Sequence, residues 1–229
     1  EIIFHLAAQP LIFESYKKPK DTYEINALGT LNLLESCRQN KSLKSLICVT
    51  SDKCYESNYS LKGFKETDKL GGKDPYSGSK ACAEIITKTY AESFFQNSKV
   101  GIATARAGNV IGGGDWAMDR IIPDFFRAME KNSPLFVRNK HAIRPWQHVL
   151  DPLSGYLNLA ERLYLNPKKY SQAWNFGPED SGCISVEKLL NLMQKYSPAT
   201  RWESTNNEEH HEATLLKLDI SKAKKLLKK

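Results

Sequence analysis

Residues 45–50 read SLICVT, an apolar run without alternation that is typical of a strand buried on both faces of a sheet. Two comparable runs, at residues 2–6 and 100–106, lie on either side of it. Apolar residues at helical spacing fill the intervals, at residues 22–39 and from about Ser79 to Phe95. Strands that alternate with helical crossovers form parallel sheets. We therefore predict an α/β fold built on a doubly wound parallel sheet.

The regular alternation of strands and helices ends after Gly114. Apolar periodicity predicts helices near residues 121–131, 150–164 and 186–196. Prolines separate them, namely Pro134, Pro145, Pro167, Pro178 and Pro198. Because proline marks turns and loops, we expect this half to form a smaller, mixed α/β lobe packed on the sheet.

The composition is that of a chain that buries a core. Of its 229 residues, 41% are hydrophobic and 26% are charged, which fits one globular unit, or a large domain with a smaller lobe, and excludes long disorder. No apolar run reaches the ~18 residues of a membrane span, and the first residues lack a secretion signal. Five scattered cysteines without a C-x-x-C pair fit reduced thiols. We expect a cytoplasmic protein without a membrane segment.

The formal charge of +7 owes much to six lysines between Lys217 and Lys229. Basic residues are not interleaved with aromatic ones along one face, and no reading motif occurs, so we expect no binding to nucleic acid. No histidine has metal-ligand spacing beside acidic partners, so we assign no metal. An anionic small molecule is compatible with this charge.

Three loops follow the predicted strands, at residues 7–9, 50–53 and 107–114, and all are rich in polar or small residues. Ligands of open α/β sheets bind outside the carboxyl ends of the strands, so these loops are the expected site. The second loop, TSDK, ends its strand in a hydroxyl, a carboxylate and an amine. Taken alone, its Ser51 and Asp52 are also compatible with a capped turn.

The segment DPYSGSK, residues 74–80, places Tyr76 and Lys80 four positions apart on one helical face, and Pro75 favours a helix start. A neighbouring ammonium favours the phenolate, so Lys80 is predicted to lower the pKa of Tyr76 and make it a usable base. A Y-x-x-x-K pattern alone is more often a partly buried tyrosine beside a surface lysine. Its combination with TSDK indicates an active site.

Seven strings give the chain a family resemblance. They are HLAAQP at residues 5–10, TSDKCY at 50–55, DPYSGSK at 74–80, RAGNVIGGGDW at 106–116, RIIPD at 120–124, HAIRPWQHV at 141–149 and WNFGP at 174–178. The chain resembles the extended short-chain dehydrogenase/reductases that act on nucleotide sugars and, among them, the CDP-glucose 4,6-dehydratases. The resemblance spans most of the chain, and its glycine-rich string is far more specific than Y-x-x-x-K.

The resemblance implies a Rossmann-like fold. Residues 1–115 would form the C-terminal part of an NAD-binding domain, and residues 116–229 mainly a substrate-binding lobe, with segments that return to the main sheet. Family members begin with a strand and a G-x-x-G-x-x-G turn that holds the cofactor pyrophosphate at a helix N-terminus. That turn does not occur in these 229 residues. We therefore expect an N-terminally truncated fragment.

The resemblance also implies the reaction, which converts CDP-D-glucose to CDP-4-keto-6-deoxy-D-glucose for deoxysugars of surface polysaccharide such as O-antigen. Transient oxidation of C4 by NAD makes the C5 proton acidic, water leaves across C5 and C6, and the hydride returns to C6. Tyr76, assisted by Lys80, takes the C4 hydroxyl proton. Ser51 orients that oxygen, and Asp52 protonates the leaving hydroxyl. Lys53 stands where related dTDP-glucose enzymes are expected to carry Glu, and acts either as a neutral C5 base or as a charge that stabilises the enolate.

Further contacts follow from the same resemblance. The cofactor-binding residues would be Ala7, Ala8, Gln9, Thr50, Tyr76 and Lys80. Asn109 would contact the sugar nucleotide, and Arg120 and Arg144 are candidates for its diphosphate, because guanidinium groups match phosphate oxygens. Without the resemblance, the small residues after the first strand would equally indicate tight packing, and the arginines an ordinary surface.

Two alternatives stay open. A nucleotide-sugar 4-epimerase shares Tyr76 and Lys80 but needs no Asp52–Lys53 pair. A non-catalytic sugar-nucleotide-binding fragment needs neither. As partners we expect the nucleotide sugar and a second copy of the chain, joined through apolar helix faces as in the family's homodimer.

Overall fold

The computed structural model describes residues 1–56, 63–205 and 215–227. Its centre is a four-stranded sheet in the order β1-β2-β3-β8, in which each neighbouring pair is parallel. The strands are β1 (Ile2–His5), β2 (Ser45–Val49), β3 (Gly101–Ala107) and β8 (Ala173–Phe176). The predicted α/β fold with a parallel sheet is confirmed. The fourth strand comes from the half of the chain in which the sequence predicted a lobe.

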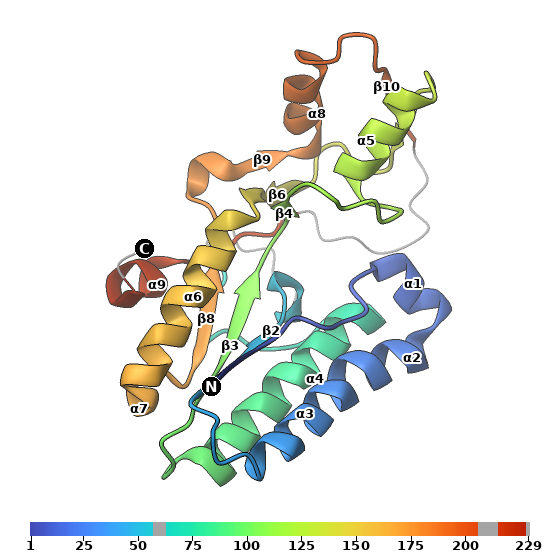
Figure 1. Cartoon of the computed structure of the whole chain (residues 1–229). Helices are drawn as coiled ribbons and strands as arrows, with labels where there is room; N and C mark the ends of the chain where they lie inside the picture. The colour runs from blue at the N-terminus through green and yellow to red at the C-terminus, as the bar shows by residue number, and fades with distance from the viewer. Residues whose placement is uncertain (57–62, 206–214, 228–229) are drawn as a thin grey trace.

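Helices cover both faces of this sheet (Figure 1). They are α1 (Ile12–Lys17), α2 (Pro19–Tyr23), α3 (Gly29–Arg38) and α4 (Pro75–Tyr90) on one face, and α6 (Leu150–Leu165), α7 (Pro167–Tyr170) and α9 (Ser221–Leu227) on the other. Neighbouring residues of β2 serve the two faces in turn, as strand geometry requires. Leu46 packs with Leu34 of α3, and Ile47 packs with Leu159 of α6. Burying each such side chain contributes about 2 kcal/mol.

The helix that carries Tyr76 begins at Pro75, as the proline predicted. This start lies ahead of the apolar periodicity, which begins at about Ser79. Asp74 caps the helix, because its carboxylate accepts hydrogen bonds from the backbone N–H of Ser77 at 2.9 Å and from its hydroxyl at 2.6 Å. The cap and the proline fix the orientation of the first turn, from which Tyr76 projects. At its other end α4 continues into a π-helical turn, η3 (Ala91–Phe95).

A second π-helical turn, η1 (Glu24–Leu28), interrupts the helix predicted over residues 22–39. It presents Asn26, whose side-chain oxygen accepts a hydrogen bond from the Gln9 N–H at 2.8 Å. The Asn26 amide donates to the Gln9 carbonyl at 3.0 Å and to the Ser79 hydroxyl at 2.9 Å. The wide turn thus ties the loop after β1 to helix α4.

The smaller part lies beyond the carboxyl ends of the main strands (Figure 1). It contains α5 (Ile121–Glu130), α8 (Val186–Gln194), the pair β5 (Leu135–Val137) and β10 (Trp202–Ser204), and the pair β6 (Ile143–Pro145) and β9 (Cys183–Ser185). The pair β4 (Val110–Ile111) and β7 (Gln147–His148) lies where the chain leaves the main sheet. The smaller part has a buried apolar cluster of its own, which includes Phe125, Leu135 and Leu190. Short helices η2 (Asp52–Cys54) and η4 (Asp180–Gly182) complete the elements. Within the described ranges, no helix is both long and apolar enough to cross a membrane.

Candidate active site

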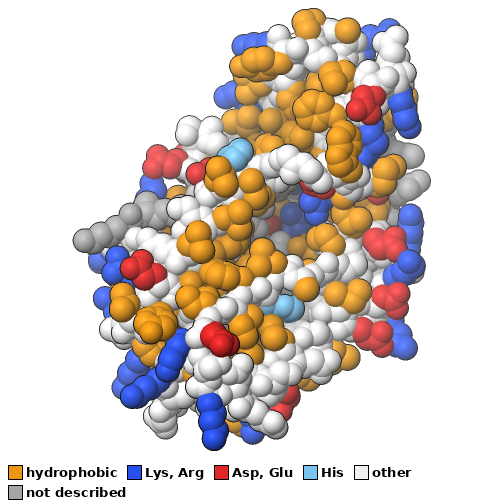
Figure 2. All heavy atoms as spheres, in the orientation of Figure 1, with side chains coloured by type: hydrophobic (Ala, Val, Ile, Leu, Met, Phe, Trp, Pro, Cys, Tyr) orange, Lys and Arg blue, Asp and Glu red, His pale blue; other side chains and the backbone are white. Residues whose placement is uncertain are grey.

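A cavity of about 480 Å³ opens between the parallel sheet and the smaller part. Figure 2 shows it as a hollow near the middle of the molecule, with Lys or Arg side chains inside. Segments that follow β1, β2 and β3 line it from below, as the loop positions predicted. Of the residues predicted for the site, those that line it are Ala8, Thr50, Ser51, Asp52, Lys53, Tyr76, Lys80, Asn109, Arg120 and Arg144.

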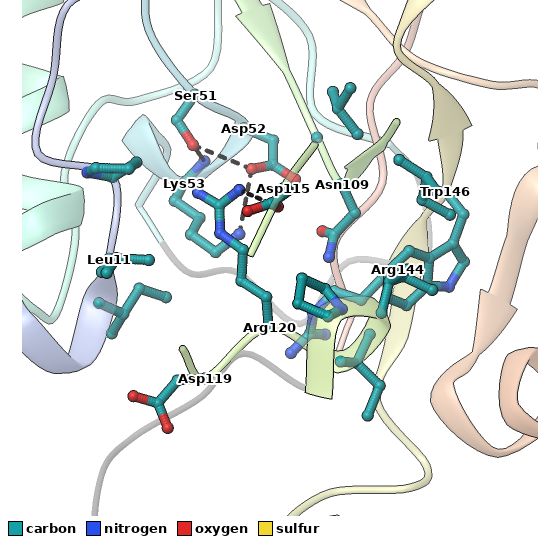
Figure 3. Close-up of a pocket in the computed structure, with 18 of the residues that line it drawn as sticks. Leu11, Ser51, Asp52, Lys53, Asn109, Asp115, Asp119, Arg120, Arg144 and Trp146 are labelled. Atoms are coloured by element: carbon teal, nitrogen blue, oxygen red, sulfur yellow. Dashed lines mark hydrogen bonds and ion pairs between the residues drawn. The ribbon is translucent and has the colours of Figure 1, made fainter. Parts of the chain in front are cut away.

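The TSDK loop, residues 50–53, turns sharply into the one-turn helix η2. Ser51 caps this helix by accepting a hydrogen bond from the Lys53 N–H at 3.2 Å, and its hydroxyl donates to Asp52 Oδ1 at 3.2 Å. Lys53 Nζ lies 3.5 Å from the same oxygen (Figure 3). Asp52 is only 1% exposed, and its Oδ2 has no hydrogen-bond partner among the described residues. The carboxylate is therefore fixed on one oxygen only.

Glycine is required directly after β3, at Gly108, where the chain passes the Asp52 carboxylate. A Cβ atom at Gly108 would lie 2.9 Å from Asp52 Oδ2 and 2.4 Å from Pro145 Cγ. Both distances are shorter than van der Waals contact, so a larger residue would displace the acid or β6. The bare backbone lets the strand end approach the TSDK loop closely.

Tyr76 and Lys80 both reach the cavity from α4, but their electrostatics differ from the prediction. Burial raises the pKa of Tyr76 to about 12, against the opposing effects of its hydrogen bond with Ser51 and the charge of Arg120. The Lys80 ammonium donates to the Val49 carbonyl at 3.2 Å, and burial lowers the pKa of Lys80 to about 8. The expectation that Lys80 lowers the pKa of Tyr76 is wrong for this structure. Helical spacing correctly predicted that Tyr76 and Lys80 share one face of the helix. It could not predict how deeply the two side chains are buried, or that the Lys80 ammonium bonds the Val49 carbonyl.

The opposite side of the cavity carries the predicted substrate contacts. Arg120 Nη1 donates to Asp115 Oδ2 at 2.8 Å, and its side chain extends toward the TSDK loop (Figure 3). The pKa of Asp115 is lowered. Burial acts to raise this pKa, but hydrogen bonds from the Ala117 N–H and from Arg120 outweigh that effect. Arg144 is 3% exposed and donates to the Ile143 carbonyl at 3.0 Å. These groups are cationic and polar, which suits an anionic ligand.

The match to known families identifies this arrangement. Residues 1–228 fit the model described as GDP-mannose 4,6 dehydratase. The chain belongs to the GDP-mannose 4,6 dehydratase family. It is 47% identical, over 97% of its length, to the CDP-glucose 4,6-dehydratase of Salmonella typhimurium, and spans 64% of that relative. It is 28% identical, over 84% of its length, to the dTDP-D-glucose 4,6-dehydratase of Dictyostelium discoideum, and spans 45% of it. The family resemblance drawn from the sequence strings is confirmed.

Solved structures give the same fold for this member of the GDP-mannose 4,6 dehydratase family. A UDP-glucuronic acid 4-epimerase from Bacillus cereus, in complex with UDP-glucuronic acid and NAD, matches 99% of the chain with a TM-score of 0.85 at 22% identity, and the match covers 69% of that structure. A dTDP-glucose 4,6-dehydratase from Streptomyces venezuelae, with NAD bound, matches 99% with a TM-score of 0.82 at 19% identity, covering 67% of it. The Rossmann-like fold is thereby confirmed.

Two residues that the sequence assigned to the cofactor lie apart from the cavity lining in this family member. Gln9 uses its side-chain oxygen to accept from the Leu11 N–H at 2.5 Å, and its amide donates to the Leu11 carbonyl at 3.1 Å and to the Thr22 hydroxyl at 2.9 Å. Ala7 is exposed. Neither residue is among the described cavity-lining residues, whereas Ala8 is. The Gln9 side chain holds together the segment that follows β1.

A buried network that the sequence analysis missed lies beneath the TSDK loop. Glu84 of α4 accepts hydrogen bonds from the Thr50 hydroxyl, from the Thr104 hydroxyl at 2.7 Å and from Arg106 Nη2 at 2.7 Å. Arg106 Nη1 donates to the Tyr55 hydroxyl at 2.7 Å. Thr50 opens the loop and Tyr55 follows it. The signal was present, because Glu84 stands four residues after Lys80 on the same helix face and Arg106 opens the RAGNV string.

Among the described residues of this family member, no group of three or more His, Cys, Asp or Glu side chains is placed to hold a metal ion. The cations that face the cavity are side chains, among them Lys53, Lys80, Arg120 and Arg144.

Proposed function

We propose that the protein containing this chain is a nucleotide-sugar 4,6-dehydratase that converts CDP-D-glucose to CDP-4-keto-6-deoxy-D-glucose. The observation that carries this proposal is the 47% identity to the Salmonella enzyme of that name. The convergence of Ser51, Asp52, Lys53 and Tyr76 on one cavity supports it. Since the chain spans 64% of that relative, the activity is assigned to the whole protein.

We assign NAD as the cofactor, which would supply a hydride acceptor that is restored in each turnover. NAD is bound in the solved epimerase and dehydratase relatives. The residues of this chain fit the group, because Ala8 and Thr50 from two strand ends line the cavity together with Tyr76 and Lys80. The small Ala8 side chain leaves room for close approach. The 229 residues contain no G-x-x-G-x-x-G turn, which would hold the cofactor pyrophosphate. The residues named here are therefore assigned to the nicotinamide half of NAD alone. In this proposal residues 1–115 serve the cofactor and residues 116–229 mainly serve the substrate.

Tyr76 is the base at the C4 hydroxyl. It acts as the phenolate, so its own proton must first pass to solvent. Burial raises its pKa to about 12, and the hydrogen bond with Ser51 and the charge of Arg120 oppose that rise. Ser51, which hydrogen-bonds the Tyr76 hydroxyl, also orients the C4 oxygen. Lys80 keeps its charge at neutral pH with a pKa of about 8 and lies in the same cavity. Withdrawal of the C4 proton and hydride makes the C5 proton acidic.

Elimination then uses the acid–amine pair of the TSDK loop. Asp52 gives a proton to the leaving C6 hydroxyl, and Lys53 acts at C5. The 3.5 Å approach of Lys53 Nζ to Asp52 Oδ1 lets a proton pass between them. In the proposed step the neutral amine of Lys53 takes the C5 proton while the protonated Asp52 gives its proton to the C6 hydroxyl, which leaves as water. Return of a proton from Lys53 to Asp52 restores the pair. The exchange of the C5 proton with solvent in a Lys53→Met variant tests this role, and unchanged exchange would remove Lys53 from the chemistry.

The test of the proposed function uses the complete gene product with CDP-D-glucose deuterated at C4. The expected product is a 4-keto sugar nucleotide with deuterium at C6. A 4-epimer without the ketone would indicate the epimerase instead, and heat of binding without turnover would indicate a sugar-nucleotide-binding protein. Lys224→Met is a suitable control, because Lys224 pairs with Glu179 on the outer helix α9 and is not among the described cavity-lining residues.

We also propose a homodimer formed through the helical face opposite α6. Apolar side chains are exposed there on η1, α4 and η3, namely Ile25, Leu28, Ile85 and Phe94. Sedimentation of wild type and Ile85→Glu tests this, and a monomeric wild type would contradict it. The five cysteines, all free thiols, support action in the cytoplasm.

A further inference from the structure

The TSDK loop is held from beneath at both ends by one buried network. At its start, the Thr50 hydroxyl donates to Glu84. Beyond its end, the Tyr55 hydroxyl receives a hydrogen bond from Arg106 and donates one to Asn175 Oδ1, each at 2.7 Å. The two ends meet in the Glu84–Arg106 ion pair, whose closest atoms are 2.7 Å apart. Between them lie Ser51, Asp52 and Lys53.

The network joins the elements that carry the proposed chemistry. Glu84 lies on α4 one turn beyond Lys80 and two turns beyond Tyr76. Arg106 lies on β3 two residues before Gly108, which contacts the Asp52 carboxylate region. Asn175 of β8 is fully buried and donates to the Phe64 carbonyl at 2.8 Å. Helix, loop and two strands therefore share one set of directional bonds.

The network is dry as well as directional. The side chains of Glu84 and Arg106 are each only 3% exposed. Removing two charges from water costs several kcal/mol per ion, so such a pair adds little net stability compared with apolar packing. Its hydrogen bonds, in contrast, fix distances and angles closely. A fixed geometry is what an active-site loop needs, since a displacement of about 1 Å can cost ~100-fold in rate.

We propose that Glu84, Arg106 and Tyr55 are positioning residues that set the place of Ser51 and Asp52 relative to Tyr76. This inference rests on the proposed dehydratase function for its kinetic consequence, but its structural consequence does not depend on any activity. Tyr55 is not among the described residues that line the cavity, so it acts through the loop and not through contact with a ligand.

Tyr55→Phe is the most selective variant for a test. It removes the hydroxyl that bonds Arg106 and Asn175 but keeps the ring, which stacks on Phe64 with centroids 4.9 Å apart and lies 4.8 Å from the Arg106 guanidinium. Thr200→Val is the matched control. Thr200 is 4% exposed and its hydroxyl shares a hydrogen bond with the Ser197 hydroxyl at 2.8 Å, but it lies in the smaller part and outside the network.

The first measurement is amide hydrogen exchange in the chain itself. Tyr55→Phe is expected to speed exchange of the amides of Lys53 and Cys54, which bond Ser51 within the loop, by about 10-fold or more. Thr200→Val is expected to leave these amides unchanged, even if both variants lower the melting temperature equally. Equal loop protection in the two variants would overturn the proposal.

The second measurement is steady-state turnover in the complete protein. Tyr55→Phe is expected to lower kcat ~10–100-fold with KM nearly unchanged, whereas Thr200→Val keeps kcat close to wild type. A loss of kcat that only follows the loss of stability, and is therefore equal in both variants, would overturn the positioning role. If wild type forms no 4-keto product, the proposed function fails, and the exchange measurement still decides whether the network positions the loop.

Discussion

The two sides of the cavity differ in how firmly their polar groups are held. On the sheet side, Thr50, Ser51 and Asp52 are 7%, 5% and 1% exposed, and each makes a hydrogen bond within the protein. On the side of the smaller part, Arg144 is buried, but the side chains of Arg120 and Asp115 are 39% and 31% exposed. Buried bonds fix geometry, while the partly exposed Arg120 keeps its water until a ligand replaces it. From this difference we propose reaction chemistry on the sheet side and ligand capture at Arg120.

The largest expected effect is a loss of kcat on replacement of Tyr76, on the sheet side of the cavity. Tyr76→Phe removes the proposed base and should lower kcat by ~10⁴-fold with a small change in KM. The ring keeps its packing, so the melting temperature should stay close to that of wild type. Steady-state kinetics with CDP-D-glucose and thermal unfolding measure the two quantities. A fall of less than ~10-fold would give the role of base to another residue.

Breaking the ion pair beneath the loop should have the next largest effect. Glu84→Gln leaves the Arg106 guanidinium buried without its counter-charge, which is expected to reduce the free energy of unfolding by about 3–4 kcal/mol. The matched control is Glu92→Gln, because Glu92 pairs with Lys88 at 3.9 Å on the surface, where both side chains are mostly exposed. Chemical denaturation should separate the two variants clearly. Equal stabilities would mean that the buried pair is not formed in solution.

The buried charge of Lys80 is expected to lower the free energy of unfolding of the protein. Burial lowers the pKa of Lys80 from 10.5 to about 8, so below pH 8 the folded state binds this proton less tightly than the unfolded chain does. Replacement by Met should therefore raise the free energy of unfolding at pH 7 by about 2 kcal/mol, after allowing for the lost hydrogen bond to Val49.

The stability difference between Lys80→Met and wild type is expected to depend on pH. Between pH 8 and pH 10.5 the unfolded chain holds more protons than the folded one, so wild-type stability rises with pH and the advantage of Lys80→Met shrinks. Denaturation curves across this range measure the gap. Lys88→Met, at a 75% exposed position of the same helix, should show no such trend. A gap that widens with pH would contradict the assignment.

Local sequence patterns predicted the sheet well because they act through neighbours in the chain. The SLICVT run became β2, and the apolar runs on either side became β1 and β3. Pro75 predicted the start of α4, which precedes the apolar periodicity that begins near Ser79, and the cap that Asp74 supplies explains it. For the site, the TSDK loop and the Tyr76–Lys80 pair could be predicted from order in the sequence alone.

The parts of the site that were missed depend on distance in space. Glu84 meets Thr50 across 34 residues and Arg106 across 22, and no local spacing connects them. The pKa of Tyr76 depends on how deeply the fold buries it, which helical spacing does not report. Gln9 was assigned to the cofactor by its place in a string, but its side chain bonds the chain's own backbone.

The smallest of the expected effects tests the more exposed side of the cavity. Arg120→Met should raise KM for CDP-D-glucose about 10-fold and leave kcat nearly unchanged, because a half-exposed guanidinium contributes about 1–2 kcal/mol to binding a diphosphate. Arg38→Met is matched in exposure, at 41% against 39%, and in its carboxylate pair, at 2.9 Å against 2.8 Å, but it lies away from the cavity. High salt should reduce the difference between Arg120→Met and wild type, since the attraction is screened.

A different outcome at Arg120 would change the division between the two sides. Its charge acts to lower the pKa of Tyr76, so the guanidinium also influences the base across the cavity. If Arg120→Met lowered kcat at constant KM, and moved the limb on which activity rises with pH to higher pH, Arg120 would belong to the reacting centre. The ligand-binding role would then fall to Arg144, which is buried and therefore better fixed.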